Sequence, residues 1–335
     1  MKKLHIIPYI LFILLVLPGL SVYADLKDGL AIWSPYTPKS HVYKGQMHAH
    51  TINSDGAQSP TNVVIAYRDA GYDFISITDH NYNTPDPGVF GILFIPGIEQ
   101  QPAGNHLNRI NATTAPARTA QGVIDQALSE GSFVFLNHPN WPGGYPNNPN
   151  WTDTELESVS GYHGIEVWNS LVSPNENAEG RIDYLLSKHL KCYLIATDDC
   201  HNVNALYSKT ASTRVFADNL TISEIMENLK RGNFYASNGA NISSITVSER
   251  TITITTDVAS TIDFITNGGT VKQSTANTIS SSYTASGEDV YIRARVTRGS
   301  DGKKAWTNPI YVSTGPITKL TNDDNLVTTW GNLKL

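Results

Sequence analysis

The segment GQMHAHTINSDG, residues 45–56, places two histidines one residue apart and an aspartate five positions beyond the second. In an extended strand, residues i and i+2 point to the same side, so the imidazoles of His48 and His50 are expected to converge. Imidazole and carboxylate groups together suit Zn²⁺, Mn²⁺ or Fe²⁺. An H-x-H pair also occurs by chance, so the segment indicates a metal site only if the rest of the chain supplies further ligands.

Further residues of metal-ligand type follow other short apolar runs of the sequence. Residues 78–80 (TDH) follow FISI, Glu99 ends GILFIPGIE, residues 137–139 (NHP) follow FVFL, and residues 198–201 (DDCH) follow CYLIAT. Six histidines are therefore expected at or just past a strand end: His48, His50, His80, His106, His138 and His201. Because the carboxyl ends of parallel strands meet at one face of a sheet, we expect these side chains to lie close together.

The elements that must position these residues alternate between apolar runs and amphipathic segments from about residue 42 to 240. Buried strands are expected at 72–78, 91–98, 132–137, 164–168, 192–197 and 213–217. Helices are expected at 59–71, 117–131, 176–191 and 221–232, several of them beginning at Ser or Thr and ending at Gly. This alternation predicts an α/β fold with a parallel sheet or barrel.

The helical pattern ends near residue 241. Residues 241–314 alternate Ile, Val, Tyr or Phe with Thr and Ser, and turn residues such as Asn267-Gly268-Gly269 interrupt the runs. Short strands at this spacing predict a small antiparallel β-sandwich of immunoglobulin type. The last segment, 315–335, fits neither pattern and is expected to be a separate tail.

The first 24 residues have the pattern of a signal peptide, with two lysines, an apolar run and small residues before a cut after Ala24. We therefore expect a secreted or periplasmic protein without a stable membrane anchor. The formal net charge is −6, and loss of the two lysines with the signal peptide leaves −8. An acidic chain is a poor partner for long nucleic acids, so a small-molecule substrate is expected.

The two cysteines, Cys192 and Cys200, lie eight residues apart in a segment that reads as one extended strand. Their α-carbons would then be about 26 Å apart at ~3.3 Å per residue, beyond the ~7 Å reach of a disulfide. Two free thiols are expected.

The order of the motifs, H-x-H with a downstream S-D-G, then T-D-H, G-I-E, N-H-P and D-x-H, resembles the PHP family, named for polymerase and histidinol phosphatase, over about residues 42–240. The resemblance implies a distorted seven-stranded (β/α), TIM-like barrel with up to three metal ions at the carboxyl face of its strands. It also implies three ligand groups: His48, His50, Glu99 and Asp199; Glu99, His106 and His138, with Glu99 shared; and Asp55, His80 and His201.

The ligand types predict hydrolytic chemistry with the divalent ions of Zn, Mn or Fe, and the resemblance implies two or three such ions. Closely spaced metals lower the pKa of a bridging water from 15.7 toward ~7 and stabilise charge on the attacked group. We expect Glu99, Asp199 and His201 to act in catalysis. Asp79 and Asp198, each next to an expected ligand, are assigned a structural role.

Residues for the substrate have weaker signals in the sequence. Glu166 and Asn169 end a strand on the expected face and either bind substrate or complete the barrel. Arg109 and Arg181 are candidates for a phosphate, whose oxygens match the guanidinium fork. The loop after His138, from Asn140 to Trp151, is a candidate wall of the substrate site.

Three functions remain open at this point. A metal-dependent phosphoesterase acting on small phosphate esters is favoured. A carboxyl ester, carbamate or amide hydrolase is the first alternative, because the same hydroxide attacks a carbonyl. The second alternative is a non-catalytic extracellular protein whose β-sandwich contacts a glycan or a protein partner.

Overall fold

The computed structural model describes residues 14–17, 20–25, 30–114, 118–141, 151–172 and 178–314. The predicted tail, 315–335, lies outside these residues, and so does part of the predicted signal peptide. The remainder of that segment contributes two described strands, β1 and most of β2. No helix among the described residues is long and apolar enough to cross a membrane.

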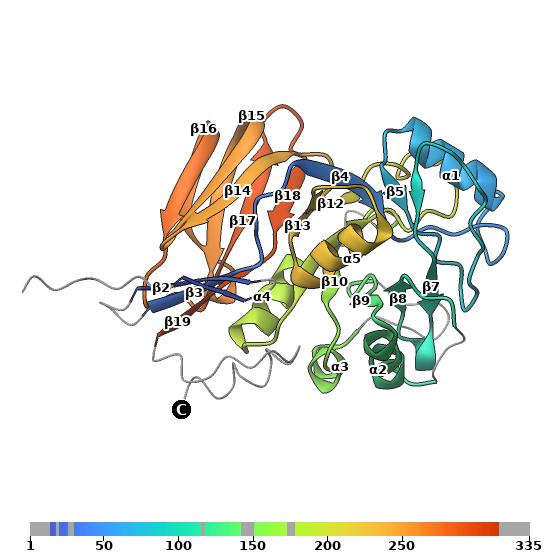
Figure 1. Ribbon diagram of the computed structural model, residues 1–335, viewed down its shortest axis with the longest axis horizontal. Coiled ribbons are helices and arrows are strands. Elements are labelled where there is room, and N and C mark those ends of the chain that lie inside the picture. Colours follow the sequence, from blue (N-terminus) through green and yellow to red (C-terminus); the bar gives the residue numbers. More distant parts are fainter. Residues whose placement is uncertain are drawn as a thin grey trace, which may run out of the picture.

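The described strands form two sheets (Figure 1). The larger sheet contains, in spatial order, β1 (Leu14–Leu17), β2 (Leu20–Asp25), β3 (Leu30–Ser34), β19 (Ile310–Thr314), β17 (Tyr291–Arg298), β18 (Lys304–Thr307), β13 (Phe234–Ser237), β12 (Ser212–Ala217), β4 (His41–Gln46), β5 (Phe74–Ile75) and β6 (Leu93–Phe94). Three further strands branch from it through β17: β14 (Ile242–Ser248), β15 (Thr251–Thr266) and β16 (Thr270–Thr284). The smaller sheet has the order β11 (Tyr193–Thr197), β10 (Gly164–Asn169), β9 (Phe133–Leu136), β8 (Leu107–Ile110) and β7 (Gly97–Gln100).

The described residues form five α-helices, and Ser or Thr side chains cap the first turns of several of them. They are α1 (Pro60–Asp69), α2 (Ala120–Glu130), α3 (Asp153–Ser158), α4 (Glu179–Ser187) and α5 (Ile222–Arg231), with short 3₁₀ turns η1 (Pro102–Gly104) and η2 (Asn267–Gly269). The side chains of Ser59, Thr119 and Thr221 cap the first turns of α1, α2 and α5. Gly131 and Gly232 end α2 and α5 at φ 72° and 84°, a conformation that glycine adopts without strain. Four of these helices were predicted; α3 was not.

The prediction of a mixed α/β fold is confirmed, whereas the distorted (β/α)7, TIM-like barrel is not confirmed. β4, β5 and β6 pair in parallel, as do β9, β10 and β11. In contrast, β7, β8 and β9 are antiparallel, and β12 runs antiparallel to β4 and to β13. The turn around η1 folds residues 97–110 back as a hairpin, which the sequence analysis had not identified.

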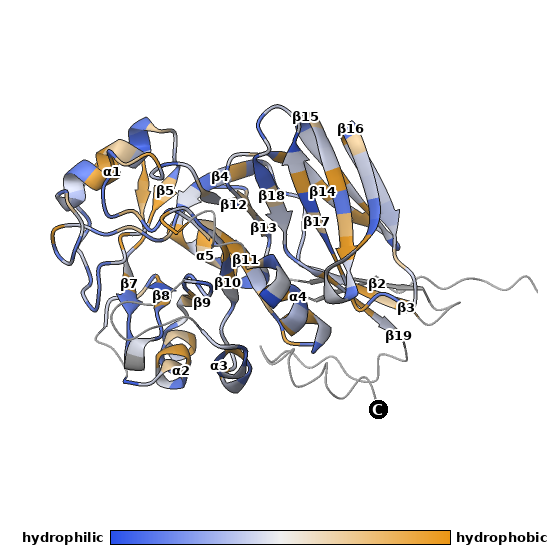
Figure 2. Cartoon of the chain, turned by 180° about the vertical axis from the view of Figure 1, so that it is seen from behind, coloured by the Kyte–Doolittle hydropathy of each residue, from blue (hydrophilic) through white to orange (hydrophobic). Residues whose placement is uncertain are grey.

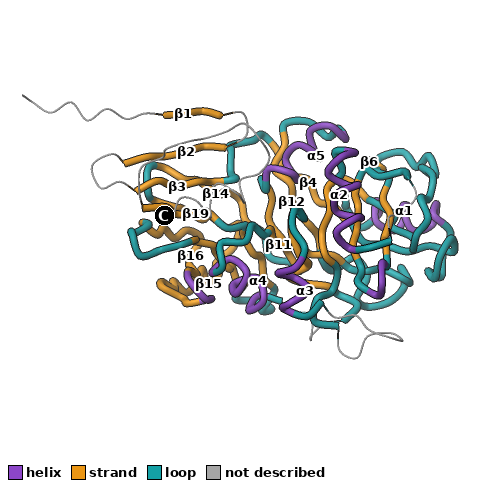
Figure 3. The backbone as a smooth tube through the Cα atoms, turned by 90° about the horizontal axis from the view of Figure 1, so that it is seen from below, coloured by secondary structure: helices purple, strands orange, loops and turns teal. Residues whose placement is uncertain are grey.

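The carboxyl-terminal strands continue the larger sheet, because β18 pairs with β13. Along β15 the first residues alternate between partly and fully buried, and bands of hydrophobic and hydrophilic colour mark this strand in Figure 2. β2, β3 and β19 run side by side at one end of the molecule (Figure 3). The expected all-β character of 241–314 is present, whereas an immunoglobulin-type sandwich is not confirmed.

A buried ion network joins α4 to β17. Arg293 Nη2 lies 2.6 Å from Asp183 Oδ2 and 3.0 Å from Glu179 Oε2, and its Nε donates to Asp183 Oδ1 at 2.8 Å. Arg295, two residues along the same strand, pairs with Glu179 and with Asp263 of β15. Because Arg293 is 1% exposed, these contacts hold the helix to the sheet inside the protein rather than at its surface.

Both cysteines are free and buried, as predicted. Cys192 lies in the apolar core that α2 and α4 cover, and Cys200 packs beside Val63 and Tyr67 of α1. Cys200 Sγ lies 3.2 Å from Ser208 Oγ, on the side away from its neighbours Asp199 and His201.

Candidate metal centre

The strand ends that carry the histidines meet at one place. Ala49 forms a parallel bridge with Cys200, and His80 forms one with Glu99. The backbone N–H of His50 donates to Cys200 O at 2.8 Å, and that of Thr78 donates to Ala49 O at 2.8 Å. These bonds fix the residues that follow β4, β5 and β11 next to β7, so nine predicted ligands from distant parts of the sequence lie together.

The first predicted ligand group is fully assembled and buried. Nε2 of His48 lies 3.1 Å from Glu99 Oε2 and 3.2 Å from Asp199 Oδ1. Nε2 of His50 lies 3.1 Å and 3.3 Å from the same two oxygens. Two imidazole nitrogens and two carboxylate oxygens therefore surround one point, as the H-x-H spacing predicts.

The second group uses the other oxygen of Glu99. Glu99 Oε1 lies 2.9 Å from His106 Nδ1 and 3.6 Å from His138 Nε2. His106 follows Glu99 by only seven residues. The hairpin β7–β8 explains this spacing, since it returns the chain so that His106 faces Glu99 across the turn. Glu99 thus lies between two groups of histidines, as a bridging ligand must.

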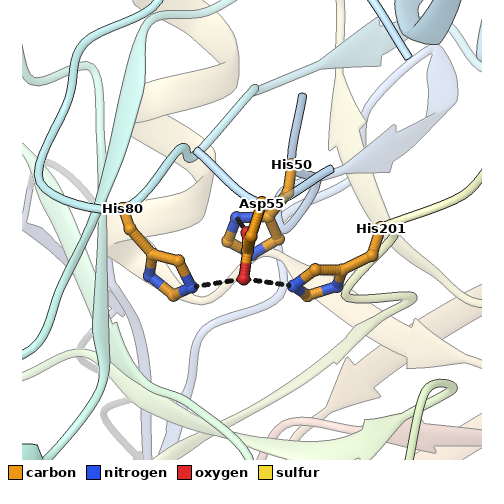
Figure 4. A group of neighbouring side chains, drawn as sticks. All are labelled: His50, Asp55, His80 and His201. Atoms are coloured by element: carbon orange, nitrogen blue, oxygen red, sulfur yellow. Dashed lines mark ion pairs between the residues drawn. The ribbon is translucent and has the colours of Figure 1, made fainter. Parts of the chain in front are cut away.

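The third group surrounds Asp55 (Figure 4). Asp55 Oδ2 lies 3.4 Å from His80 Nε2 and 3.3 Å from His201 Nε2, while Oδ1 lies 3.5 Å from His50 Nδ1. The Asp55 side chain is 53% exposed, in contrast to the first group. The centre therefore opens to solvent at Asp55.

Hydrogen bonds to the outer ring nitrogens select the tautomers. Nδ1 of His48 lies 2.7 Å from Glu166 Oε1 and donates to it, which leaves the lone pair on Nε2 for the first group. Nδ1 of His201 donates to the Asp199 carbonyl at 3.0 Å, which leaves Nε2 facing Asp55. Both rings are thus held with a ligand lone pair pointing into the cluster.

Distances within the cluster fit ligands of a shared cation better than hydrogen-bonded pairs. Most nitrogen–oxygen separations in the first and third groups are 3.1 to 3.5 Å. Charged hydrogen bonds are shorter, about 2.7–2.9 Å, whereas ligands on a tetrahedral ion with bonds of ~2.0–2.1 Å are about 3.3 Å apart. Among the described residues, His50 Nε2 and Asp199 Oδ1 are buried without a hydrogen-bond partner. The residues present therefore fit divalent metal ions.

The carboxylates shift the histidine pKa values upward. Burial lowers the pKa of His48 and of His50, but Asp199 and Glu99 outweigh it, raising the pKa of His50 to about 9 and that of His48 well above its usual value. Burial raises the pKa of Glu99 and of Asp199, and the surrounding histidines reverse this and bring both well below the usual range. The same field that favours protons on these imidazoles favours a divalent cation between them.

Glu166 and Asn169, predicted to contact substrate, support the ligands instead. Glu166 is fully buried and binds His48 Nδ1, the hydroxyl of Thr197 at 2.5 Å and the backbone N–H of His138 at 2.7 Å. Asn169 Nδ2 donates to Glu166 Oε2 and to Asp199 Oδ2. Both are fully buried, and these contacts are with ligand residues of the cluster and their neighbours.

Arg109 does not lie in the cluster, so its assignment to a phosphate is wrong. It pairs with Ile98 in the β7–β8 register, and its guanidinium donates to Gln100 Oε1 and Glu130 Oε2. Because side chains alternate along a strand, Gln100 and Arg109 point to the face opposite Glu99. Arg109 is fully buried there and anchors the end of α2.

The aspartates beside the ligands fix the loops, as predicted. Asp79 accepts from Thr51 N at 2.7 Å and from Ser54 Oγ at 2.7 Å, which holds the loop that carries Asp55. Asp198 accepts from Tyr67, Gln46 and the backbone N–H groups of residues 209–211. Two ligands have positive φ, His138 at 27° and Asp199 at 52°, a strained backbone that is typical of functional sites.

The loop after His138 is described only at its two ends. The Trp141 ring lies 4.9 Å from the His138 ring, so it borders the second ligand group. Trp151 is instead part of the core, 1% exposed, and its Nε1 donates to His106 O. Arg181 donates to Pro139 O and pairs with Asp153. Residues 142–150 of this predicted wall lie outside the described residues.

Three polar neighbours of the cluster were not predicted as site residues. Asn137 Nδ2 donates to Glu99 Oε1 at 2.7 Å, and Gln101 Nε2 lies 2.7 Å from His80 Nδ1. Thr197 binds Glu166. Their only sequence signal is adjacency to a strand end, a position that ordinary polar residues also occupy.

No family model and no curated protein matches the chain, whereas several solved structures do. One is a two-domain protein containing a predicted PHP-like metal-dependent phosphoesterase from Bacteroides vulgatus, with 23% identity and a TM-score of 0.48 over 78% of this chain and 93% of that one. Another is a candidate metal-dependent phosphoesterase from Bifidobacterium adolescentis, with 15% identity and a TM-score of 0.41 over 55% and 96%. A lesion-specific endonuclease from Pyrococcus furiosus matches with 14% identity and a TM-score of 0.42 over 57% and 56%.

Proposed function

We propose that this protein is a metal-dependent hydrolase of the PHP type, a phosphoesterase that acts on small phosphate esters. The observation that supports this most directly is the convergence of six histidines with Asp55, Glu99 and Asp199 at one edge of the fold, at the separations expected of metal ligands. An arrangement of this size exceeds what one structural ion needs. Two or three ions, Zn, Mn or Fe, suit its mixed nitrogen and oxygen ligands.

The ligands on the buried side and on the exposed side of the site have different roles. Such ions would supply hydroxide from water near neutral pH and would stabilise charge on the phosphoryl group. Glu99 holds the two histidine groups at a fixed separation through its two oxygens. Asp199 completes the buried group, and His201 lies at the open edge, 26% exposed at its side chain, where a substrate phosphate approaches. These three residues therefore contact the ions or the substrate directly.

The proposal includes export of the chain and cleavage after Ala24. Cleavage would remove β1 and most of β2, and β3 would then form the edge of the larger sheet. Amino-terminal sequencing of the protein from its native host tests this, because a mature chain is expected to begin at Asp25. Recovery of a chain that still carries residues 1–24 would contradict it. The acidic net charge supports a small substrate rather than a long nucleic acid.

A comparison of esters with and without metal tests the activity. Metal-free protein is reloaded with Mn²⁺ or Zn²⁺ and assayed on generic phosphate monoesters and on carboxyl esters. Turnover of phosphate esters that depends on metal is expected, with loss in His48→Ala and retention in His41→Ala, an exposed histidine outside the cluster. Turnover confined to carboxyl esters would replace the phosphoesterase with a carbonyl hydrolase. A protein that binds metal and hydrolyses nothing would instead be a binding protein.

A further inference from the structure

The open side of the metal centre is bordered by three loops. Asp55, His80 and His201 lie on these loops, with side-chain exposures of 53%, 20% and 26%, and His106 on the other side of Glu99 is 20% exposed. His48 and His50 lie beneath them and are inaccessible. A substrate therefore reaches the centre past the loops at residues 51–58, 80–84 and 201–208.

These loops are fastened to one another by hydrogen bonds. Asn53 Nδ2 donates to Thr84 Oγ1 at 3.0 Å, which joins the first loop to the second. Ala57 N donates to His201 O at 2.7 Å, and the side chain of Gln58 donates to that of Asn202, which joins the first loop to the third. The three loops thus form one continuous border with the 51–58 loop in the middle.

Each of the three loops exposes a large apolar side chain close to its ligand. Ile52, two residues after His50, is 61% exposed; Tyr82, two residues after His80, is 48% exposed; Leu206, five residues after His201, is 98% exposed. A single exposed apolar residue is ordinary in a soluble protein. Here one stands on each loop that carries Asp55, His80 or His201, and exposed apolar surface beside an opening often marks a ligand site. We call the side chains of Ile52, Tyr82 and Leu206 the apolar border.

Other exposed apolar side chains of the described chain lie elsewhere. Phe90, at the far end of the segment that begins with Tyr82, adjoins Gly91, which packs against Arg68 in the last turn of α1. The rest lie on α2, α4, β15 and β16: Leu128, Tyr184, Val258, Val271 and Ile279. The apolar border is therefore a feature of the metal centre, and Phe90 provides a matched control.

We propose that the organic group of the substrate is apolar, an alkyl or aryl chain that contacts Ile52, Tyr82 and Leu206 while its phosphate enters the ligand cluster. This inference rests on the phosphoesterase function proposed above and names its substrate class. The Trp141 ring, 4.9 Å from His138, adds an aromatic surface beside the second ligand group. Contact with these side chains removes apolar surface of the ester from water and so favours binding of longer chains.

Alkyl phosphates of increasing length test the inference, because lengthening the chain leaves the leaving-group chemistry nearly constant. With metal-loaded protein, kcat/KM is expected to rise about twofold per added methylene from ethyl to hexyl phosphate, below the roughly fourfold of a fully buried methylene. Ile52→Ser and Leu206→Ser are expected to flatten this slope. Phe90→Ser is expected to leave the slope unchanged.

The possible failures are distinguishable. Hydrolysis of all the alkyl phosphates at one kcat/KM would overturn the inference and leave the phosphoesterase intact. A slope that Phe90→Ser reduces as much as Leu206→Ser does would also overturn it. If no phosphate ester is hydrolysed, the proposed function fails, and binding of hexylphosphonate against methylphosphonate to the metal-loaded protein still tests the apolar border. Equal affinities for the two phosphonates would then reject the inference. Concentration-dependent dimerisation that Leu206→Ser abolishes would also reject it, because the apolar border would then contact a second copy of the chain.

Discussion

Two buried groups of charged side chains in this protein differ in the spacing of their charged atoms. In the network between α4 and β17, the Arg293 guanidinium meets carboxylate oxygens at 2.6 to 3.0 Å, the lengths of charged hydrogen bonds. In the metal centre, His48 and His50 lie 3.1 to 3.3 Å from the carboxylates, the separations of ligands on a shared ion. Each group has buried atoms without a hydrogen-bond partner among the described residues: Arg293 Nη1 in the first, His50 Nε2 and Asp199 Oδ1 in the second. The first group carries its own permanent cation, whereas the spacing of the second fits an added one.

Replacing the shared carboxylate of the metal centre should have the largest effect. Glu99→Gln removes one negative charge from between two histidine groups, so more than one equivalent of metal is expected to be lost. We expect kcat/KM to fall by about 10³-fold or more, comparable to loss of a principal electrostatic group. Elemental analysis and kinetics of purified protein measure both. Retention of the full metal content would contradict this prediction, because metal binding would then not depend on Glu99.

Removing the cation of the other group should lower stability without affecting metal. Arg293→Met leaves Asp183 and Glu179 buried without this partner, and we expect the free energy of unfolding to fall by about 3–5 kcal/mol. Denaturant unfolding measures this, and metal content per folded molecule should stay unchanged. Lys39→Ala, which breaks the partly exposed pair with Asp218, serves as control and should cost less than about 1 kcal/mol. Equal losses in the two variants would contradict the prediction.

A change beneath the ligands should have a smaller effect on metal binding. Glu166→Gln keeps the size of the side chain but weakens its hold on His48 Nδ1, so the imidazole loses its fixed tautomer. Replacement of such supporting carboxylates lowers metal affinity by about 10- to 100-fold. Competition with a chelator measures the affinity. An unchanged affinity would mean that the buried bond contributes to folding alone, as the bonds of Arg293 do.

The dependence of metal binding on pH should be gradual. Histidine binds metal only when neutral, and the pKa of His50 is raised to about 9. Below pH 9 the metal must therefore displace a proton from His50, so its affinity should fall about tenfold for each unit by which the pH drops. In metal-free protein the raised pKa stabilises the fold below pH 6.5, and this stabilisation is lost as pH rises toward 9. The difference in Tm between metal-loaded and metal-free protein should therefore be larger at pH 9 than at pH 6.5. The same difference at both pH values would show that protons and metal do not compete.

Several ligands of the metal centre were predictable because they follow apolar runs of the sequence. His80, His138 and Asp199 follow strands that lie within the expected ranges, and the structure brings them together. Glu99 lies in β7, which with β6 replaces the single strand expected at 91–98. The roles of the residues around the ligands could be assigned only from tertiary contacts. Whether Glu166 meets a substrate or His48 depends on its depth along β10, which the residue pattern does not specify.

The errors have a common physical origin in the pairing of strands. The prediction of an all-parallel barrel missed β8, a four-residue strand after a turn that contains Pro102 and Gly104. The assignment of Arg109 to a phosphate used only the shape of its guanidinium group and took no account of this hairpin. Its register opposite Ile98 places it on the other face, because one residue of alternation reverses the direction of a side chain.

The pairing of β13 with β18 has a consequence for the order of events during synthesis. β13 borders β12, which borders β4, so the sheet beneath His48 is completed only by residues 304–307. Until those residues leave the ribosome, β13 presents an unpaired edge that another chain can join. Fragments that end near residue 240 should therefore aggregate, and the metal ligands should reach their final geometry late, after nearly the whole chain has been made.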